Sequence, residues 1–158
     1  MDTRLLQLLL AGVCLVVLVI AAGCTGAGPG CQVTADIELE LSFPIRYWEL
    51  QGKQGKGRFF IFIVEILFAL LALVLLVLRI LRQYIRPAEL AISAAGALLC
   101  LIAGITEACY GAGIVFRHNK GLPEMGCDGW IAAAFFLLVA TVAFGADAFL
   151  TLSRRGQI

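Results

Sequence analysis

The sequence predicts an all-α membrane protein, a four-transmembrane-helix bundle with a small extracellular β-hairpin in its first loop. First, 61% of the 158 residues are hydrophobic and only 15% are charged, whereas soluble globular domains carry about 25% charged residues. Second, four apolar runs each reach the roughly 20 helical residues that cross a bilayer. Third, an eleven-residue stretch between the first two runs alternates apolar and polar residues without interruption, which is typical of a strand.

The four expected helices occupy about residues 5–23, 59–80, 88–110 and 130–152, within a single domain of residues 1–158. The links between them are a long one at 24–58, a very short turn, and one of medium length at 111–129. An even number of crossings places both termini on the same side of the membrane, so the two longer links share the opposite side.

The first apolar run has an alternative interpretation as a cleaved secretion signal. Ala21, Ala22 and Gly23 precede Cys24 and resemble the small-residue end of such a signal. The run is longer than the roughly 7–15 apolar residues of a typical signal core, and Arg4 is the one basic residue before it. We therefore expect the run to be retained as the first helix.

The alternating stretch, Val33 to Phe43, predicts one strand of a hairpin outside the membrane. An isolated strand is not stable in water, and residues 45–50, IRYWEL, supply a return strand. One alternative is that the apolar face of this hairpin caps the helix bundle. The other is that its free edge recruits a strand from a second copy or a partner protein. The residues expected to carry that contact are Ile37, Leu39, Leu41, Phe43, Tyr47 and Trp48.

Charge and cysteine placement favour cytoplasmic termini. Arginines near the expected inner ends lie in very short segments, where the positive-inside rule applies, whereas acidic residues accompany the basic residues of the longer links. An oxidising outer compartment would allow four cysteines in or beside those links to pair. These are Cys24, Cys31, Cys109 and Cys127. We favour the pairs Cys24–Cys31 and Cys109–Cys127 among the three connectivities; free thiols in a reducing compartment are the alternative.

Small residues recur at every fourth position of the third expected helix and predict a packing seam. Lipid gives helices no hydrophobic drive to associate, so small residues that admit close backbone approach make the contacts. The seam comprises Gly96, Cys100, Gly104 and Ala108. The second expected helix is almost wholly bulky, and we expect it to meet lipid over much of its surface.

Three carboxylates, Glu65, Glu107 and Asp147, lie within the expected spans. An aspartate at a helix centre costs roughly 2.5–3.5 kcal/mol on insertion scales, so each carboxylate requires a partner or a role. Glu65 and Glu107 share the outer rim, where they either bind a proton or cation or hold helices in register through hydrogen bonds to groups such as Thr106. The expected cationic partners of Asp147 at the inner end are Arg4, Arg79 and Arg82.

The sequence carries no motif typical of an enzyme or a metal site. The single histidine, His118, lies in a polar link, and HExxH, paired CxxC, GxSxG and glycine-rich phosphate-loop patterns are missing. A net charge of +1 gives no basic field for nucleic acid. We expect no catalysis, no cofactor and no nucleic-acid partner. The expected partners are membrane lipids and membrane proteins, including further copies of this chain.

The segment WIAAAFFLLVATVAFGADAFLTLSRRG resembles the last helix of the MARVEL-domain family, in which two small residues and two phenylalanines lead to an aromatic residue, an Asp-Ala-Phe or Ser-Ala-Phe triplet and a basic end. The residues that carry this pattern are Ala133, Ala134, Phe135, Phe136, Phe144, Asp147, Ala148, Phe149, Arg154 and Arg155. LIAGITEACY is similar to the third helix of the myelin-and-lymphocyte protein group, and RLLQLLLAGVCL is similar to the start of the family's first helix.

The resemblance implies a tetraspan in the plasma membrane or a vesicle membrane that takes part in membrane apposition, cell junctions or vesicle trafficking without catalysis. Short members such as plasmolipin have little in the first outer loop, whereas this chain has roughly 35 residues there. Claudin-like proteins have a long first loop built of strands, but their Gly-Leu-Trp motif is missing here. Two other functions remain open, an accessory subunit of a larger receptor or channel, and an oligomeric channel or proton pathway through Glu65 and Glu107.

Overall fold

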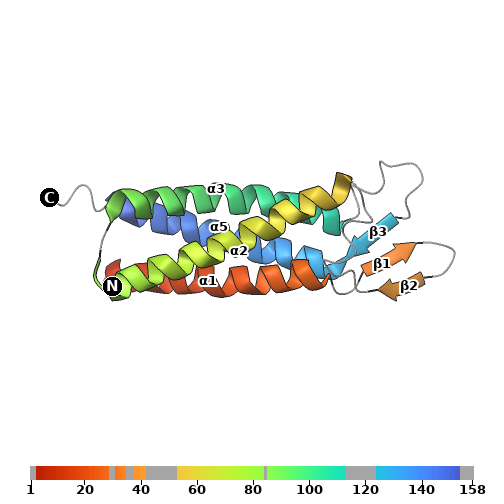
Figure 1. Ribbon diagram of the computed structural model, residues 1–158, viewed down its shortest axis with the longest axis horizontal. Coiled ribbons are helices and arrows are strands. Elements are labelled where there is room, and N and C mark those ends of the chain that lie inside the picture. The colour runs from red at the N-terminus through yellow and green to blue at the C-terminus, as the bar shows by residue number, and fades with distance from the viewer. Residues whose placement is uncertain are drawn as a thin grey trace.

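Four long helices form the body of the protein. The computed structural model describes residues 3–28, 31–34, 38–41, 53–83, 85–112 and 124–153. The helices are α1 (Thr3–Ala27), α2 (Lys53–Ile80), α3 (Arg86–Gly111) and α5 (Asp128–Ser153), and they lie side by side along one axis (Figure 1). Each is long and apolar enough to cross a membrane. The start of α1, the α2–α3 turn and the end of α5 meet at one end, called here the termini end.

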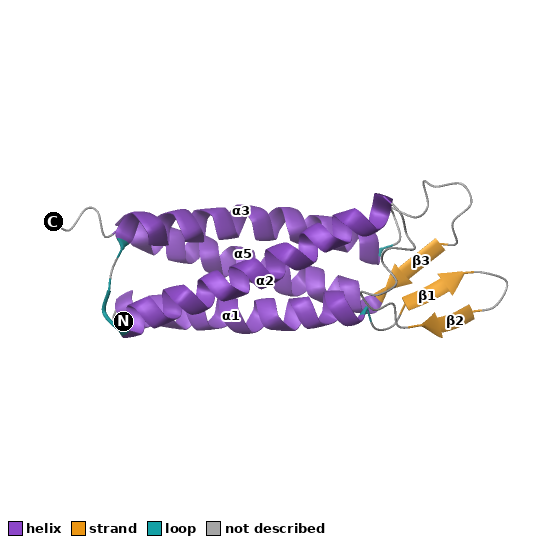
Figure 2. Ribbon diagram, in the orientation of Figure 1, coloured by secondary structure: helices purple, strands orange, loops and turns teal. Residues whose placement is uncertain are grey.

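Three short strands form a sheet at the other end of the bundle, called here the sheet end (Figure 2). They are β1 (Cys31–Thr34), β2 (Glu38–Leu41) and β3 (Glu124–Cys127), in the antiparallel order β2-β1-β3. Strand β1 is central, so it connects the link that follows α1 with the link that precedes α5. The described parts of the two longer links therefore pair in one sheet.

The predicted hairpin is not supported, because the expected single strand from Val33 to Phe43 is divided. Its residues contribute to two strands, β1 and β2, which pair with each other. Strict alternation does not distinguish one long strand from two short ones, and Asp36, a residue type common in turns, lies between them. The expected return strand, residues 45–50, lies outside the described residues. So do four of the residues expected to carry the outer contact, namely Ile37, Phe43, Tyr47 and Trp48.

The register of the sheet pairs apolar residues with apolar ones and polar residues with acidic ones. Val33 is opposite Leu39 on β2 and Met125 on β3, and Thr34 is opposite Glu38 and Glu124. The sequence does not predict β3, because EMGC is too short to carry a visible alternation.

Both predicted disulfides are wrong. Cys24 and Cys109 are free thiols, and each lies inside a helix, because α1 extends to Ala27 and α3 extends to Gly111. Cys31 lies on β1, where the register places it directly opposite Cys127. The sheet thus brings together two cysteines that the expected pairing assigned to separate links.

Helices α3 and α5 make the most extensive contact in the bundle, and glycines of the predicted seam lie in it. A Cβ atom added at Gly96 would lie 2.9 Å from the Phe144 ring, and one at Gly104 would lie 3.2 Å from the Cβ of Leu137. Cys100 is fully buried between these glycines, whereas Ala108 is only half-buried. The small residues therefore permit a close approach of the two backbones, as helix packing in lipid requires.

The outward faces of the helices carry large apolar side chains. Val16 on α1, Ile63 on α2, Ile105 on α3 and Val142 on α5 are all exposed. A soluble bundle would place polar residues on these faces, whereas lipid requires apolar ones. Helix α2 also buries one face against the bundle. The expected contact with lipid therefore applies only to its other, exposed face.

Candidate functional site

The buried polar side chains of the described residues gather near the two ends of the bundle. We name the group at the termini end the termini-side cluster. It consists of Gln7, Arg79, Glu89, Ser93, Asp147 and Thr151. We name the group at the sheet end the sheet-side cluster. It consists of Thr25, Arg58, Glu65, Glu107, Tyr110 and Trp130.

Arg79 of α2 is the centre of the termini-side cluster. Its Nη2 atom lies 2.8 Å from Asp147 Oδ2 on α5 and 3.2 Å from Glu89 Oε2 on α3. Its Nη1 atom donates to the backbone carbonyl of Gln7 on α1 at 2.7 Å. The hydroxyl of Ser93 donates to Asp147 Oδ2 at 2.6 Å. One guanidinium therefore connects its own helix to the other three.

Further hydrogen bonds close this cluster. Gln7 Nε2 donates to Thr151 Oγ1 at 3.1 Å, and Thr151 Oγ1 donates to the carbonyl of Asp147 at 2.9 Å. Arg4, which is half-buried, donates through Nη2 to the carbonyl of Arg79 at 3.3 Å. Hydrogen bonds to charged groups are the stronger kind, so the cluster fixes the helix ends relative to one another.

The sheet-side cluster also draws on all four helices. Arg58 Nη2 of α2 lies 3.6 Å from Glu107 Oε1 of α3. The guanidinium carbon of Arg58 lies 3.0 Å from the centre of the Trp130 ring on α5 and 5.7 Å from that of Tyr110. These distances are those of cation–π contacts. Thr25 of α1 donates its hydroxyl proton to Glu65 Oε1 of α2 at 2.8 Å.

Comparison with known protein families agrees with this architecture. The family model for MARVEL, described as a membrane-associating domain, matches residues 4–150, from the first turn of α1 to within α5. The chain belongs to the MARVEL family. The resemblance inferred from the sequence is thereby confirmed, and this MARVEL protein is a multi-pass membrane protein. No curated protein and no solved structure matches the chain.

The carboxylates that the sequence of this MARVEL protein singled out lie in these clusters. Asp147 contacts Arg79, one of its three candidate partners. Glu65 and Glu107 both belong to the sheet-side cluster, where Thr25 is the hydroxyl donor to Glu65. Thr106, the hydroxyl group suggested by the sequence, instead donates to the carbonyl of Ile102 at 2.7 Å.

The sequence reasoning missed Arg58 as a member of the site. The second helix was expected to begin at residue 59, whereas α2 begins at Lys53, so Arg58 lies inside the helix and is fully buried. The spacing carried a usable signal. Arg58 and Glu65 are seven residues apart, two helical turns, so they share a face of α2 with the buried Ile61 between them.

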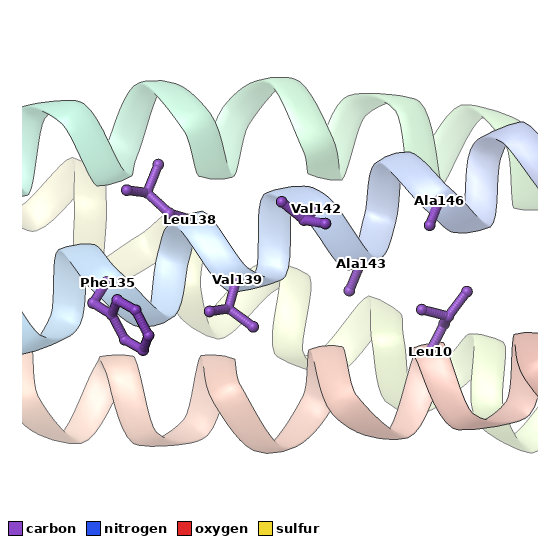
Figure 3. Close-up of a pocket in the computed structure, with 7 residues that line it drawn as sticks. All are labelled: Leu10, Phe135, Leu138, Val139, Val142, Ala143 and Ala146. Atoms are coloured by element: carbon purple, nitrogen blue, oxygen red, sulfur yellow. The ribbon is translucent and has the colours of Figure 1, made fainter.

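An apolar groove lies between α1 and α5 of the MARVEL bundle (Figure 3). Its volume is about 450 Å³. The side chains that line it are Leu10, Phe135, Leu138, Val139, Val142, Ala143 and Ala146. With no polar side chain in its wall, the groove suits an acyl chain or an apolar helix and has no group that would orient a polar ligand.

The described part of the chain brings no three histidine, cysteine, aspartate or glutamate side chains together as metal ligands. His118 lies outside it. The contacts described in the two clusters are ion pairs, hydrogen bonds and cation–π contacts.

Proposed function

We propose that this MARVEL protein is a non-enzymatic tetraspan that organises membrane apposition, cell junctions or vesicle trafficking, with both termini cytoplasmic, in the plasma membrane or a vesicle membrane. The observation that carries the proposal is the pair of polar clusters, each of which joins all four helices. A body fixed at both ends holds its outer sheet at a constant position and orientation above the bilayer.

The core between the clusters supports a scaffold over a conduction pathway. Polar residues that line an ion or proton pathway continue through the middle of the membrane. Here the buried residues of the middle are apolar or small. They include Leu18, Phe68, Ala72, Cys100, Ala103, Leu137, Ala140 and Phe144. Phe68 and Phe144 pack edge to face with ring centres 5.9 Å apart, which fills the centre of the bundle.

The sheet supplies the surface through which we propose that the protein meets a second copy of itself on an apposed membrane. Among the described strands, β2 and β3 are the edges of the sheet. An edge strand presents backbone donors and acceptors that a strand of another chain can pair with. Leu39 and Leu41 belong to β2, and Ile37 comes directly before it. Apolar residues at such an edge favour association, whereas lysine is the residue type that proteins use to prevent it.

A vesicle-tethering experiment tests this function. Liposomes carrying the purified protein are expected to cluster, as measured by light scattering. The double substitution Ile37→Lys and Leu39→Lys is expected to reduce clustering at least tenfold, because the added charges oppose edge pairing. The matched control is Gln32→Lys with Thr34→Lys, which adds the same charge to the central strand β1. Equal clustering by wild type and the β2 variant, at equal incorporation into the liposomes, would refute the proposal.

We also propose that a disulfide between Cys31 and Cys127 joins the two outer links. The register places these residues directly opposite each other in neighbouring strands. The free cysteines of the described residues are Cys14, Cys24, Cys100 and Cys109, and Cys127 is not one of them. Directly opposed cysteines of an antiparallel pair have Cα separations of about 4.5–5.5 Å, which a disulfide can span.

Peptide mapping tests this pairing. Digestion without reductant is expected to yield a peptide pair linked through Cys31 and Cys127, which separates on reduction. Replacing Cys127 by serine is expected to lower the free energy of unfolding by roughly 2–5 kcal/mol, because the link between the two loops is lost. Alkylation of Cys31 in the unreduced protein from intact cells would contradict the pairing.

A further inference from the structure

We propose that the sheet-side cluster is a proton-binding site, in which Glu65 and Glu107 hold one proton between them. The inference goes beyond the scaffold function, because a scaffold requires only that the cluster hold the helices together and does not require it to bind a proton. It rests on two features of the cluster, namely the burial and number of its charged groups, and the hydrogen bonds that its carboxyl oxygens lack.

The first feature is burial together with the charge count. The side chains of Glu65, Glu107 and Arg58 are all 0% exposed. Among the described residues, Arg58 is the cation that acts on both carboxyl groups. Two ionised carboxylates and one guanidinium would leave a net charge of −1 in a site closed to water. A buried net charge is strongly unfavourable, and one bound proton removes it.

The second feature is a shortage of hydrogen-bond donors. Ionised carboxylates only accept hydrogen bonds, whereas a protonated carboxyl group also donates one. Thr25 has a single hydroxyl proton, which Glu65 Oε1 accepts. In the part of the chain that the structure describes, Glu65 Oε2 has no hydrogen-bond partner, and the Glu107 oxygens have the ion pair with Arg58 at 3.6 Å but no hydrogen bond. A proton on one carboxyl group supplies a missing donor.

The other neighbours among the described residues do not change this charge balance. The titratable neighbours are the thiol of Cys24 on α1, and the thiol of Cys100 and the phenol of Tyr110 on α3. Trp130 on α5 contributes an uncharged ring. Neutral thiols and phenols add no positive charge, so the balance stays at two carboxyl groups against one guanidinium.

A metal ion fits this site less well than a proton. The guanidinium of Arg58 already lies beside Glu107 and over the Trp130 ring, so a second cation would be repelled at short range. The described residues also lack the three acidic, histidine or cysteine ligands that a resident metal would require. A proton needs only an oxygen of each carboxyl group.

The termini-side cluster provides a comparison within the same molecule. It also holds two carboxylates, Glu89 and Asp147, around one central arginine, Arg79. However, Arg4 lies against the carbonyl of Arg79 and brings a second positive charge, and Ser93 and Arg79 supply the donors to Asp147 Oδ2. The charges of that cluster are balanced without a bound proton. Glu89 Oε1 and Asp147 Oδ1 also lack a hydrogen-bond partner among the described residues, so it is the charge count that confines the proposal to the sheet end.

Infrared spectroscopy of the full-length protein in lipid nanodiscs at pH 7 tests the proposal. The wild type is expected to show the C=O stretching band of one protonated carboxyl group, which shifts in D2O. Glu65→Gln and Glu107→Gln are each expected to abolish the band, because one carboxylate then balances Arg58. Arg58→Gln is expected to double it, because both carboxyl groups must then be neutral. The control is Asp128→Asn, which removes an exposed carboxyl group and should leave the band unchanged.

Two results would overturn the proposal. One is a wild-type spectrum at pH 7 without a protonated-carboxyl band. The other is a band that persists at full intensity in both glutamine variants, which would assign the proton to a different acid. Both glutamine variants keep the size of the side chain and one carboxylate beside Arg58, so the test does not depend on whether Arg58→Gln folds.

Discussion

Replacing Arg79 by methionine is expected to lower the free energy of unfolding by about 3–5 kcal/mol, the range observed when one partner of a buried ion pair is removed. Arg79 is 1% exposed and contacts Glu89 and Asp147, which are almost equally buried. Methionine keeps the length and apolar character of the side chain. The loss therefore reflects two buried carboxylates that no longer have their cation, together with the lost hydrogen bond to the Gln7 carbonyl.

Reversible unfolding in detergent micelles or nanodiscs measures this change, and Arg82→Met is its matched control. Arg82 lies three residues further along the chain, in the turn that follows α2, and its side chain is exposed. Its replacement is expected to change the free energy of unfolding by no more than about 0.5 kcal/mol, as is usual for surface positions. If the free energy of unfolding fell by the same amount in both variants, the buried contacts of Arg79 would contribute no more to stability than an exposed arginine does.

Replacing Gly96 by leucine is expected to lower the free energy of unfolding by about 1–3 kcal/mol, the usual effect of overpacking a filled core. The first added atom would already lie 2.9 Å from the Phe144 ring, and the rest of the side chain would extend into the contact between α3 and α5. Phe144 is 1% exposed and packs on Phe68, so it has little room to move aside. The two helices must separate to admit the larger side chain.

The control for this substitution is Gly12→Leu on α1. A Cβ atom at Gly12 would have nothing within 4 Å, so the added side chain points into open space. Stability is expected to be unchanged or higher, because glycine inside a helix is less favourable than alanine by roughly 0.5–1 kcal/mol. Both variants are compared by the same unfolding measurement, and equal effects at the two glycines would contradict close packing at Gly96.

The four helices could be predicted from sequence because each depends on a local property, an apolar run long enough to cross a bilayer. Their ends were less predictable. Lys53 to Arg58 are polar or glycine residues that precede the apolar run of α2, yet the helix already includes them. Composition marks where the apolar segment begins, whereas the helix begins where the backbone takes up helical hydrogen bonding, and the two points need not coincide.

The residues of the clusters were predictable in part. A carboxylate within an apolar run is easily recognised in a sequence, so Glu65, Glu107 and Asp147 could be identified as candidates. Its partner is selected by the packing of four helices, and sequence spacing does not determine that packing. Asp147 had three candidate arginines near its level, and only the fold brings Arg79 against it. Arg58 was not identified, because it follows other basic residues of the link and precedes the apolar run.

The strand pairing of the sheet could not be predicted from local sequence. The alternation around Asp36 is compatible with one strand or two, and the pairing of β1 with β3 joins residues at least ninety positions apart, as in Cys31 with Cys127. Such a pairing has no local signature. The disulfide assignment failed for the same reason, because it depended on which loops fold together.

The measurement that most directly tests whether buried polar contacts hold the four helices together is a double-mutant cycle on Arg79 and Asp147, by equilibrium unfolding in lipid nanodiscs. The variants are Arg79→Met, Asp147→Leu and the double substitution. A direct ion pair at 2.8 Å predicts that the double variant loses at least about 1 kcal/mol less stability than the sum of the single variants. Additivity within about 0.3–0.5 kcal/mol would show that the two side chains do not interact, and would contradict the account.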